Sequence, residues 1–343
     1  MASATTILSP RPLSLALPPY FHNKTRGCCS HASRTMPHDS GARMRFSPHY
    51  LSCNQRRSSA RAKKNPGSSP AATVEPPFNV LVAMKSLHND IMIVDSSTTR
   101  FLTLDSTNNI HSMLNKEQPW TGSYWDEFAS LPAIVPEGPI AILGLGGGTA
   151  AHTMLKAWPN LHLQGWEIDE TLIDLAREYF GLSDLEKCTS AGGFLSVHIG
   201  DALSESVTTG GGFAGIIVDL FSGGEILPQL KKVSTWLDIE KKLISKGRIM
   251  VNCGGAYAEV YGSGKQTVNA NVLSTGSWIK NSTIKALCQA FPGKLSWKRM
   301  EEKDSDNYLA LTGPLPDLDA WSAAVPAELS MNVKEWRMCE LSS

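Results

Sequence analysis

The 343-residue sequence predicts an α/β protein in which a mostly parallel sheet ends in an antiparallel strand pair and follows a small N-terminal β segment. Three observations support this fold class. From residue 139 onward, short apolar runs alternate with helical runs, which is typical of parallel strands joined by crossover helices. One apolar run leads directly into a glycine-rich turn that opens a helix. Near the C-terminus, two β-rich runs follow each other with only a polar turn between them.

The first 74 residues do not share this pattern. They contain 11 basic residues and a single acid, Asp39, with much Ser and Pro and no apolar periodicity. Such a segment buries too little apolar surface to offset the entropy of ordering, so we expect residues 1–74 to be a disordered leader and linker. An acid-poor leader rich in Arg and Ser is typical of an organelle transit peptide, and the Met-Ala-Ser opening favours the chloroplast stroma over the mitochondrion. A plain basic tail is the alternative.

The remaining residues carry 21 basic and 31 acidic side chains, so the neutral total conceals two oppositely charged parts. An acidic balance disfavours binding to nucleic acid, which needs clustered Lys and Arg. No apolar run approaches the ~18 residues of a membrane span. We therefore expect neither nucleic acid nor a membrane as a partner. The cysteines outside the leader lack the spacing of metal ligands, and no metal is expected.

Residues 78–118 form the predicted N-terminal β segment. Apolar runs at 91–94, 100–104 and 110–114 are separated by clusters of Asp, Asn and Ser, which is the pattern of a small antiparallel sheet. The following stretch, 120–131, is predicted to be a helix that enters the main domain. Ser123 is a plausible N-cap, with Asp126 three residues later.

Residues 119–320 form the predicted main domain. Its expected strands lie at 140–143, 161–166, 195–199, 214–218 and 248–252. Helices are expected between them at 150–157, 170–180 and 226–245, with Gly247 ending the last. A helix at 278–291 and a strand pair at 294–299 and 307–312 complete the domain. Residues 321–343 are predicted to be a C-terminal tail.

The clearest candidate for a ligand site is the turn that follows the strand at 140–143. Glycines let the backbone come close to a ligand, and the N-terminus of the next helix supplies unpaired N–H groups. Gly144, Gly146 and Gly148 have the spacing Gly-x-Gly-x-Gly. A dinucleotide fingerprint needs Gly or Ala at the next position, where Thr149 stands, so the pattern disfavours a nicotinamide cofactor.

Acids follow three successive strands after this turn. Glu167 lies about 20 residues beyond it, where an acid can accept hydrogen bonds from both hydroxyls of a ribose. A surface acid is the alternative, and the nearby Asp169 is expected to be a helix N-cap. Asp201 follows the third strand and is either a ligand or a turn aspartate. Asp219 ends the fourth strand, where a carboxylate holds a cationic nitrogen, accepts a proton, or caps a loop.

Together these residues resemble the spermidine synthase (aminopropyltransferase) family, a branch of the class I S-adenosylmethionine-dependent methyltransferase superfamily with its Rossmann-like sheet. The resemblance covers residues 79–312 and rests on the β segment, the helix with Tyr124, and the motifs Gly146-Gly-Gly, Glu167-Ile-Asp, Gly200-Asp-Ala and Ile217-Val-Asp. The implied ligand is S-adenosylmethionine or its decarboxylated form. The residues implied to bind it are Gly144, Gly146, Gly148, Glu167, Ile168, Asp201 and Ala202.

The resemblance also assigns roles within this site. It implies that Asp201 receives the adenine amino group and that Ala202 contributes backbone contacts. Asp219 and Tyr124 are the implied catalytic residues, Asp219 by orienting or deprotonating the acceptor and Tyr124 by shaping its pocket. Dimers are common in the family, so a homodimer is an expected assembly.

Departures from the family pattern fall on the acceptor side. The family motif Gly-Gly-Gly-Asp-Gly reads Gly-Gly-Gly-Thr-Ala here, so Thr149 replaces an acid. The motif Asp-Ser-Ser-Asp-Pro reads Asp-Leu-Phe-Ser-Gly, so Ser222 replaces a second acid, and Tyr-His-Glu reads Tyr-Trp-Asp. The resemblance implies that the missing acids bind amines. Because an unpaired buried charge costs several kcal/mol, their loss disfavours a diamine substrate.

The sequence therefore predicts a plastid transferase that uses S-adenosylmethionine, with methyl transfer to an unidentified small-molecule acceptor as the leading hypothesis. Methyl transfer needs mainly the alignment of acceptor, methyl carbon and sulfonium, which positioning alone supplies. Two alternatives stay open. One is aminopropyl transfer in polyamine biosynthesis. The other is a non-catalytic binding protein that has lost the substrate acids.

Overall fold

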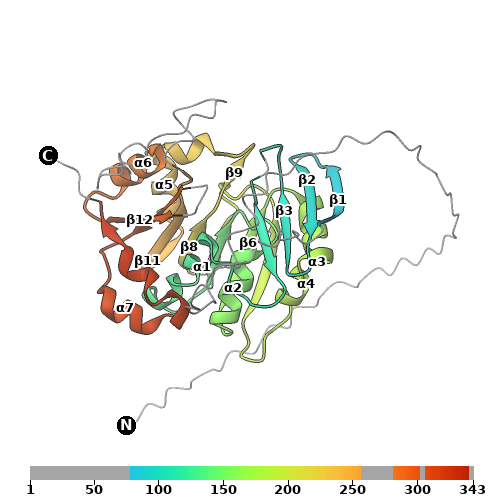
Figure 1. The fold of residues 1–343 in the computed structure, drawn as a ribbon. Helices are drawn as coiled ribbons and strands as arrows, with labels where there is room; N and C mark the ends of the chain where they lie inside the picture. The colour runs from blue at the N-terminus through green and yellow to red at the C-terminus, as the bar shows by residue number, and fades with distance from the viewer. Residues whose placement is uncertain (1–77, 108, 256–280, 302–305, 340–343) are drawn as a thin grey trace, which may run out of the picture. The chain divides into compact units, whose positions relative to one another are not determined.

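The computed structural model describes residues 78–107, 109–255, 281–301 and 306–339. The predicted transit peptide and linker, residues 1–74, lie outside these ranges, as do the start of the helix predicted at 278–291 and the polar turn at 302–305. The described residues form an antiparallel sheet near the N-terminus and a larger mixed sheet with helices on both faces (Figure 1).

The N-terminal sheet has four antiparallel strands that pair in chain order. They are β1 (Asn79–Lys85), β2 (Asp90–Asp95), β3 (Thr99–Thr103) and β4 (Ser112–Asn115). Alternate side chains of a strand point to opposite faces. Ile91 and Ile93 of β2 therefore share one buried face with Leu102 of β3, and this face packs against Leu172 and Phe180 of the main domain.

The main sheet has eight strands in the order β14-β12-β13-β11-β8-β5-β6-β7. Its parallel part consists of β5 (Ile140–Leu143), β6 (His162–Glu167), β7 (Phe194–Ile199), β8 (Phe213–Val218) and β11 (Leu243–Asn252). The antiparallel part consists of β12 (Leu295–Glu301), β13 (Asp306–Thr312) and β14 (Arg337–Met338). Since the strand order reverses beside β5, the carboxyl ends of β5 and β8 mark the edge where open α/β sheets bind ligands.

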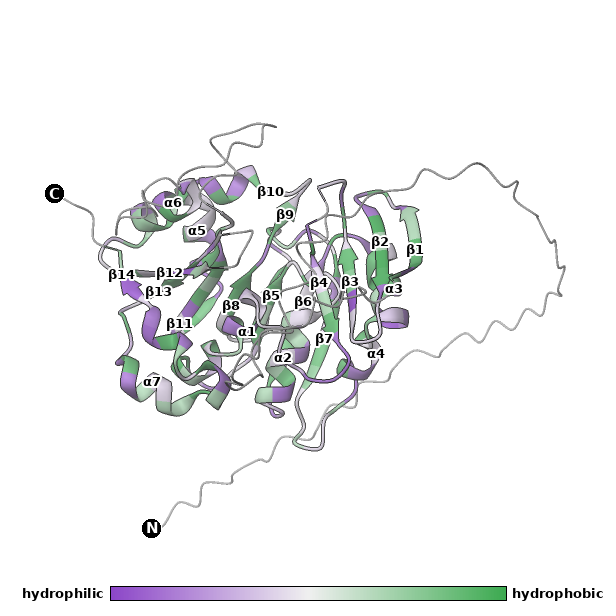
Figure 2. Ribbon diagram, in the orientation of Figure 1, coloured by the Kyte–Doolittle hydropathy of each residue, from purple (hydrophilic) through white to green (hydrophobic). Residues whose placement is uncertain are grey.

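Helices cover both faces of this sheet, so its central strands are apolar throughout. Every residue of β5 and of β8 is buried. Ile140 and Ile142 face a core shared with α2 (Thr149–Ala157), whereas Ala141 and Leu143 face the core shared with α5 (Val233–Glu240) and α6 (Ser282–Ala290). Figure 2 shows apolar residues gathered on strands such as β2, β7 and β8. No helix among the described residues is long and apolar enough to cross a membrane.

The N-terminal sheet is tied to the start of α3 (Glu170–Tyr179), which precedes the short α4 (Leu182–Leu185). Asp169 is the N-cap of α3, as the sequence predicted, and it accepts a hydrogen bond from Leu172 N at 3.3 Å. Its second oxygen accepts hydrogen bonds from Ser86 Oγ and, at 2.7 Å, from Asn89 Nδ2 in the turn between β1 and β2. The Asp169 carboxylate therefore both caps α3 and holds the N-terminal sheet against it.

The long helix predicted at 226–245 is wrong. A small hairpin of β9 (Phe221–Ser222) and β10 (Glu225–Ile226) ends where the predicted helix begins. The stretch itself contains a 3₁₀ turn η3 (Pro228–Lys231), the short helix α5 and the first residues of β11. Gly247 does not end a helix but lies inside β11, with its Cα close enough to Ala214 O that an added Cβ would lie 3.0 Å from it. At the end of the stretch Leu243 pairs in parallel with Phe213 of β8, so tertiary pairing overrides the local helical spacing there.

Residues 321–339 also differ from the tail predicted for 321–343. They continue α7 (Leu318–Ala324) into two 3₁₀ turns, η6 (Ala327–Leu329) and η7 (Asn332–Glu335), and end in β14 beside β12. Trp321 and Trp336 are each 2% exposed, and Trp321 Nε1 donates to Ser130 O at 2.9 Å. The segment is packed by separate large side chains on short turns, which leave no periodic pattern in the sequence.

Candidate active site

All predicted site residues except Tyr124 lie at or just after the carboxyl ends of β5, β6, β7 and β8, which meet along one edge of the main sheet. Backbone hydrogen bonds continue past the strands and hold their tips in register. Gly144 N donates to Trp166 O at 3.1 Å, Gly200 N donates to Glu167 O at 2.8 Å, and Asp219 N donates to Leu143 O at 2.9 Å. The turns that follow these strands are therefore neighbours.

The glycine-rich turn needs glycine for two reasons, conformation and space. Gly144, Gly146 and Gly148 have φ values of 88°, 55° and 87°, a region that L residues with side chains rarely adopt. A Cβ on Gly144 would lie 2.2 Å from Asp219 O, so only glycine lets the turn after β5 come this close to the end of β8. Gly148 is the N-cap residue of α2.

Glu167 lies directly against this turn. Its Oε2 accepts a hydrogen bond from Gly146 N at 3.0 Å, and its Oε1 accepts from Ile168 N at 2.9 Å and from Asp169 N at 3.2 Å. Burial raises the pKa of Glu167 above its ordinary value, and the three N–H groups oppose that rise. The side chain of Ile168 is 47% exposed. The acid expected to contact a ribose thus lies beside the turn expected to approach the same ligand.

Asp201 is exposed and shapes its own turn. Its Oδ1 accepts a hydrogen bond from Leu203 N at 2.8 Å, and its carbonyl accepts from Ser204 N at 3.1 Å. This is the turn role that the sequence left open beside a ligand role. Its Oδ2 has no hydrogen-bond partner among the described residues, and it remains available to a donor. The next residue, Ala202, is buried.

Asp219 and Tyr124 are brought together across 95 residues of sequence. Tyr124 Oη donates to Asp219 Oδ2 at 3.1 Å and lies 3.4 Å from Oδ1, while Asn252 Nδ2 donates to Oδ1 at 3.0 Å. Burial raises the pKa of Asp219 to about 6, although hydrogen bonds from Asn252, Tyr124 and Trp125 lower it. A carboxylate with this pKa can take up or release a proton near neutral pH.

Asn252 was not identified from the sequence. It is the last residue of β11, is 2% exposed, and uses its Oδ1 to accept a hydrogen bond from Gly254 N at 3.0 Å. The one available signal was a polar residue at the end of an otherwise apolar strand. That signal points to the site only when β11 is known to pair with β8, because the pairing brings Asn252 next to Asp219.

The helix that carries Tyr124 is shorter than the one predicted at 120–131. Helix α1 (Tyr124–Phe128) is followed by a 3₁₀ turn, η2 (Leu131–Ile134). Asp126 does not complete a capping box with Ser123. Instead its carboxylate accepts hydrogen bonds from the Thr121 backbone and hydroxyl and from Gly122 N, all within 3.0 Å. Burial raises the pKa of Asp126 to about 6.

The two positions where acids are replaced supply no charge to this site. The Thr149 hydroxyl accepts a hydrogen bond from Met113 N at 2.8 Å and donates to Met113 O at 3.0 Å. Thr149 is 3% exposed, so its side chain joins α2 to β4 rather than facing an acceptor. Ser222 lies in the β9–β10 hairpin, and its side chain is exposed.

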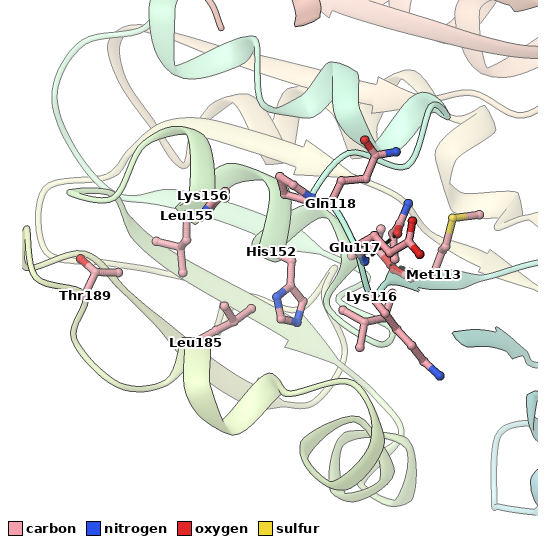
Figure 3. Close-up of a pocket in the computed structure, with 13 residues that line it drawn as sticks. Met113, Lys116, Glu117, Gln118, His152, Leu155, Lys156, Leu185 and Thr189 are labelled. Carbon is pink, nitrogen blue, oxygen red and sulfur yellow. Dashed lines mark hydrogen bonds between the residues drawn. The ribbon is translucent and has the colours of Figure 1, made fainter. Parts of the chain in front are cut away.

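A cavity of about 410 Å³ lies elsewhere, on the outer side of α2 (Figure 3). Figure 3 places His152, Leu155 and Leu185 around it, with the segment after β4 on its other side. Burial lowers the pKa of His152, whose Nε2 lies 2.7 Å from Phe180 O. None of the carboxylates that end β6, β7 or β8 lines this cavity, although Thr149 at the start of α2 does.

No protein-family model matches the chain. Among curated proteins, a probable polyamine aminopropyl transferase of Bifidobacterium longum (strain NCC 2705) is 31% identical over 103 residues. The match covers 30% of this chain and 23% of the relative, so it spans less than a quarter of that protein's length.

Solved structures show the same fold at low sequence identity. A spermidine synthase solved in complex with the transition-state analogue AdoDATO has a TM-score of 0.51 at 15% identity, covering 68% of this chain and 73% of its own. A probable spermidine synthase from Corynebacterium glutamicum has a TM-score of 0.51 at 16% identity, covering 78% and 99%. The predicted fold class and the resemblance to the spermidine synthase-like branch are confirmed.

Replacing Gly144 by Ala tests the close approach of the two strand tips. Gly192 is a matched control because it has the same φ of 88° with nothing within 4 Å of an added Cβ. We expect Gly192→Ala to cost about 1 kcal/mol of unfolding free energy, from backbone strain alone. Gly144→Ala should cost about 2–4 kcal/mol, because its Cβ also collides with Asp219 O. Urea unfolding measures both, and equal losses would contradict the contact.

The raised pKa of Asp219 predicts a pH-dependent stability. Because its pKa rises from 3.8 to about 6 on folding, its favourable contribution is complete below the unfolded pKa and is lost as pH rises through about 6. Asp219→Asn should therefore be more stable than the parent at pH 8, by on the order of 1–3 kcal/mol relative to the same comparison at pH 4. Asp174→Asn, at an exposed carboxylate of α3, is the control. A difference that does not change between the two pH values would rule out a raised pKa.

Proposed function

We propose that the protein is a transferase that binds S-adenosylmethionine, or its decarboxylated form, and moves a group from the sulfonium to a small acceptor. One observation carries the proposal. Asp219, held by Tyr124 and Asn252, lies against the same glycine turn that Glu167 contacts from the other side. Acid-base chemistry is thus placed next to the features that suit a nucleoside. The spermidine synthase fold and the aminopropyl transferase relative support the same conclusion.

The residues at the strand tips fit the nucleoside half of such a ligand. Glu167 ends β6 beside Gly146 N, where a carboxylate can accept hydrogen bonds from a ribose diol. Asp201 follows β7, which pairs with β6, and its free Oδ2 can accept from an exocyclic amine. The sulfonium of the bound ligand supplies the electrophilic carbon. Glu167 and Asp201 would bind and orient the ligand, with backbone N–H groups of the glycine turn beside them.

Asp219 is the group suited to the acceptor. With a pKa of about 6 it is mostly ionised at pH 7, so it can hold a cationic nitrogen or accept the proton that a nucleophile releases. Tyr124 and Asn252 each donate to one of its oxygens, which fixes the orientation of the carboxylate. The Asp219 carboxylate, held in this orientation, would then orient the nucleophile of the acceptor.

Methyl transfer to an acceptor with a single nucleophilic group fits these residues best. A diamine brings two positive charges into the site, and each needs a partner when it is desolvated. Thr149 and Ser222 stand where the family has acids, and the Thr149 hydroxyl is already bonded to Met113. Aminopropyl transfer to a polyamine is the second candidate, and the name of the Bifidobacterium relative is the observation that favours it.

Binding of methylthioadenosine and of S-adenosylmethionine tests the nucleoside site. We expect both ligands to bind the parent protein in isothermal titration calorimetry. Asp201→Ala should weaken binding about tenfold or more, because the amine donor of the ligand loses its charged acceptor. Glu205→Ala removes an exposed acid from the same loop and should leave the affinity unchanged. If neither ligand binds the parent, the proposed cofactor is wrong.

The by-product of turnover separates the two transfer reactions. Methyl transfer from S-adenosylmethionine leaves S-adenosylhomocysteine, whereas aminopropyl transfer from the decarboxylated form leaves methylthioadenosine. We expect S-adenosylhomocysteine when the protein is incubated with S-adenosylmethionine and a low-molecular-mass chloroplast extract. Asp219→Asn should reduce the rate about 100-fold or more, because the acceptor loses its base.

Two further arms complete this experiment, with both by-products measured by mass spectrometry. Methylthioadenosine formed from decarboxylated S-adenosylmethionine and putrescine would favour the second candidate instead. A known spermidine synthase, assayed in parallel, is the positive control. If the protein binds the nucleoside but forms neither by-product above a protein-free blank, it is a binding protein and the transferase proposal fails.

A further inference from the structure

Helix α1, which carries Tyr124, is too short to hold its own position. It has five residues, all buried. A single turn of helix is unstable alone, because fixing the first turn costs more entropy than its few hydrogen bonds return. Contacts with the rest of the protein must therefore set both the place of α1 and its rotation about its axis.

A buried ion pair anchors α1 to β12. Lys298 Nζ of β12 lies 3.0 Å from Glu127 Oε1, and the two side chains are 1% and 0% exposed. Asn332 of η7 donates from Nδ2 to the same Oε1 at 2.8 Å, and its carbonyl accepts from Lys298 Nζ at 2.7 Å. Glu335 lies 3.3 Å from Lys298 Nζ but is largely exposed.

The cluster of Glu127, Lys298 and Asn332 is not an efficient way to raise the free energy of unfolding. Removing two charges from water is costly, and well-packed apolar residues in place of such a pair are often equally stable or more so. Glu127 Oε2 is buried and has no hydrogen-bond partner in the described part of the chain, which adds to the cost. What the pair does provide is a fixed rotation of α1 about its axis. Glu127 Oε1 reaches both Lys298 Nζ and Asn332 Nδ2 only in one orientation of the helix.

Orientation matters because the contact made by Tyr124 is already long. Its hydroxyl lies 3.1 and 3.4 Å from the oxygens of Asp219, at or beyond the usual limit for an O–H···O bond. Tyr124 and Glu127 lie three residues apart on the same turn, so any rotation of α1 moves both. A small rotation would take the hydroxyl out of reach of Asp219.

We propose that Lys298 is a positioning residue which, through Glu127 and Asn332, fixes the rotation of α1 and thereby keeps the Tyr124 hydroxyl on Asp219. The consequence for catalysis rests on the proposed function, but the geometric claim does not. The Asp126 carboxylate also ties α1 to Thr121 and Gly122, and two further hydrogen bonds hold the chain just beyond the helix. Trp158 Nε1 donates to Ala129 O, and Trp321 Nε1 donates to Ser130 O, both at the C-terminal end of the helix.

Titration of Asp219 by carbon NMR tests the proposal without an activity assay. The signal is assigned by its loss in Asp219→Asn. Because the Tyr124 hydroxyl lowers the pKa of Asp219, Tyr124→Phe should raise that pKa above about 6. We expect Lys298→Met to raise it at least as far, because rotation of α1 also moves Trp125. Tyr124→Phe/Lys298→Met should raise it no further than Lys298→Met alone. Lys294→Met, at an exposed lysine just before β12, should leave it unchanged.

The double variant also excludes a direct effect of the lost charge. Lys298→Met removes a positive charge, which by itself would raise the pKa of Asp219, but that effect would persist when Tyr124 is already Phe. An additive rise in the double variant would therefore overturn the proposal, as would an unchanged pKa in folded Lys298→Met. If Lys298→Met does not fold, Glu127→Gln/Lys298→Met replaces it, because that variant leaves no unpaired buried charge.

A transfer assay on the same variants separates this proposal from the proposed function. If transfer is observed, Lys298→Met should lower it by at least the factor that Tyr124→Phe does. If no variant shows transfer while the two pKa values rise together, the positioning role stands and the transferase proposal fails. If transfer occurs in the parent and in Lys298→Met at equal rates, Lys298 does not position the site.

Discussion

The close approach of the turn after β5 to the end of β8 is the constraint on which the candidate site depends. These strands are paired in parallel, with Leu143 opposite Val218, so their tips end at the same level. At Gly144 the distance is too small for any side chain, because a Cβ would lie 2.2 Å from Asp219 O. This contact places the turn suited to a nucleoside directly beside the residue whose carboxylate is suited to an acceptor.

Two outer parts of the chain then hold the site from different directions. On one side, the N-terminal sheet is bonded to the start of α2, where Ser112 Oγ accepts from Gly147 N at 2.8 Å and Thr149 bonds to Met113. On the other side, the C-terminal segment packs around α1, with Trp321 bonded to Ser130. The sheet edge that carries the candidate site consists of turns, so its geometry relies on these two supports.

The chemistry of the acceptor side depends on Thr149 and Ser222, which stand where the spermidine synthase family has acids. The Thr149 hydroxyl forms both of its hydrogen bonds with the backbone of Met113 in β4. It therefore holds the glycine turn against β4 and supplies no second negative charge. Asp219 remains, with a pKa near 6 and hydrogen bonds from Tyr124 and Asn252, among others, that fix its orientation. One such carboxylate can bind one proton or pair with one cationic group. A substrate with two cationic groups would leave one of those groups unpaired.

The sequence by itself determined the features that depend on local order. The buried strands, the glycine turn and the acids Glu167, Asp201 and Asp219 could be placed because hydrophobic period and turn chemistry act over a few residues. Only the tertiary structure decided which side chains meet. The end of β11 lies beside β8 and brings Asn252 to Asp219, and α1 is buried against Lys298, which is 171 positions after Glu127 in the chain. Such contacts arise from strand pairing and packing between distant segments, and no short window of sequence contains both partners.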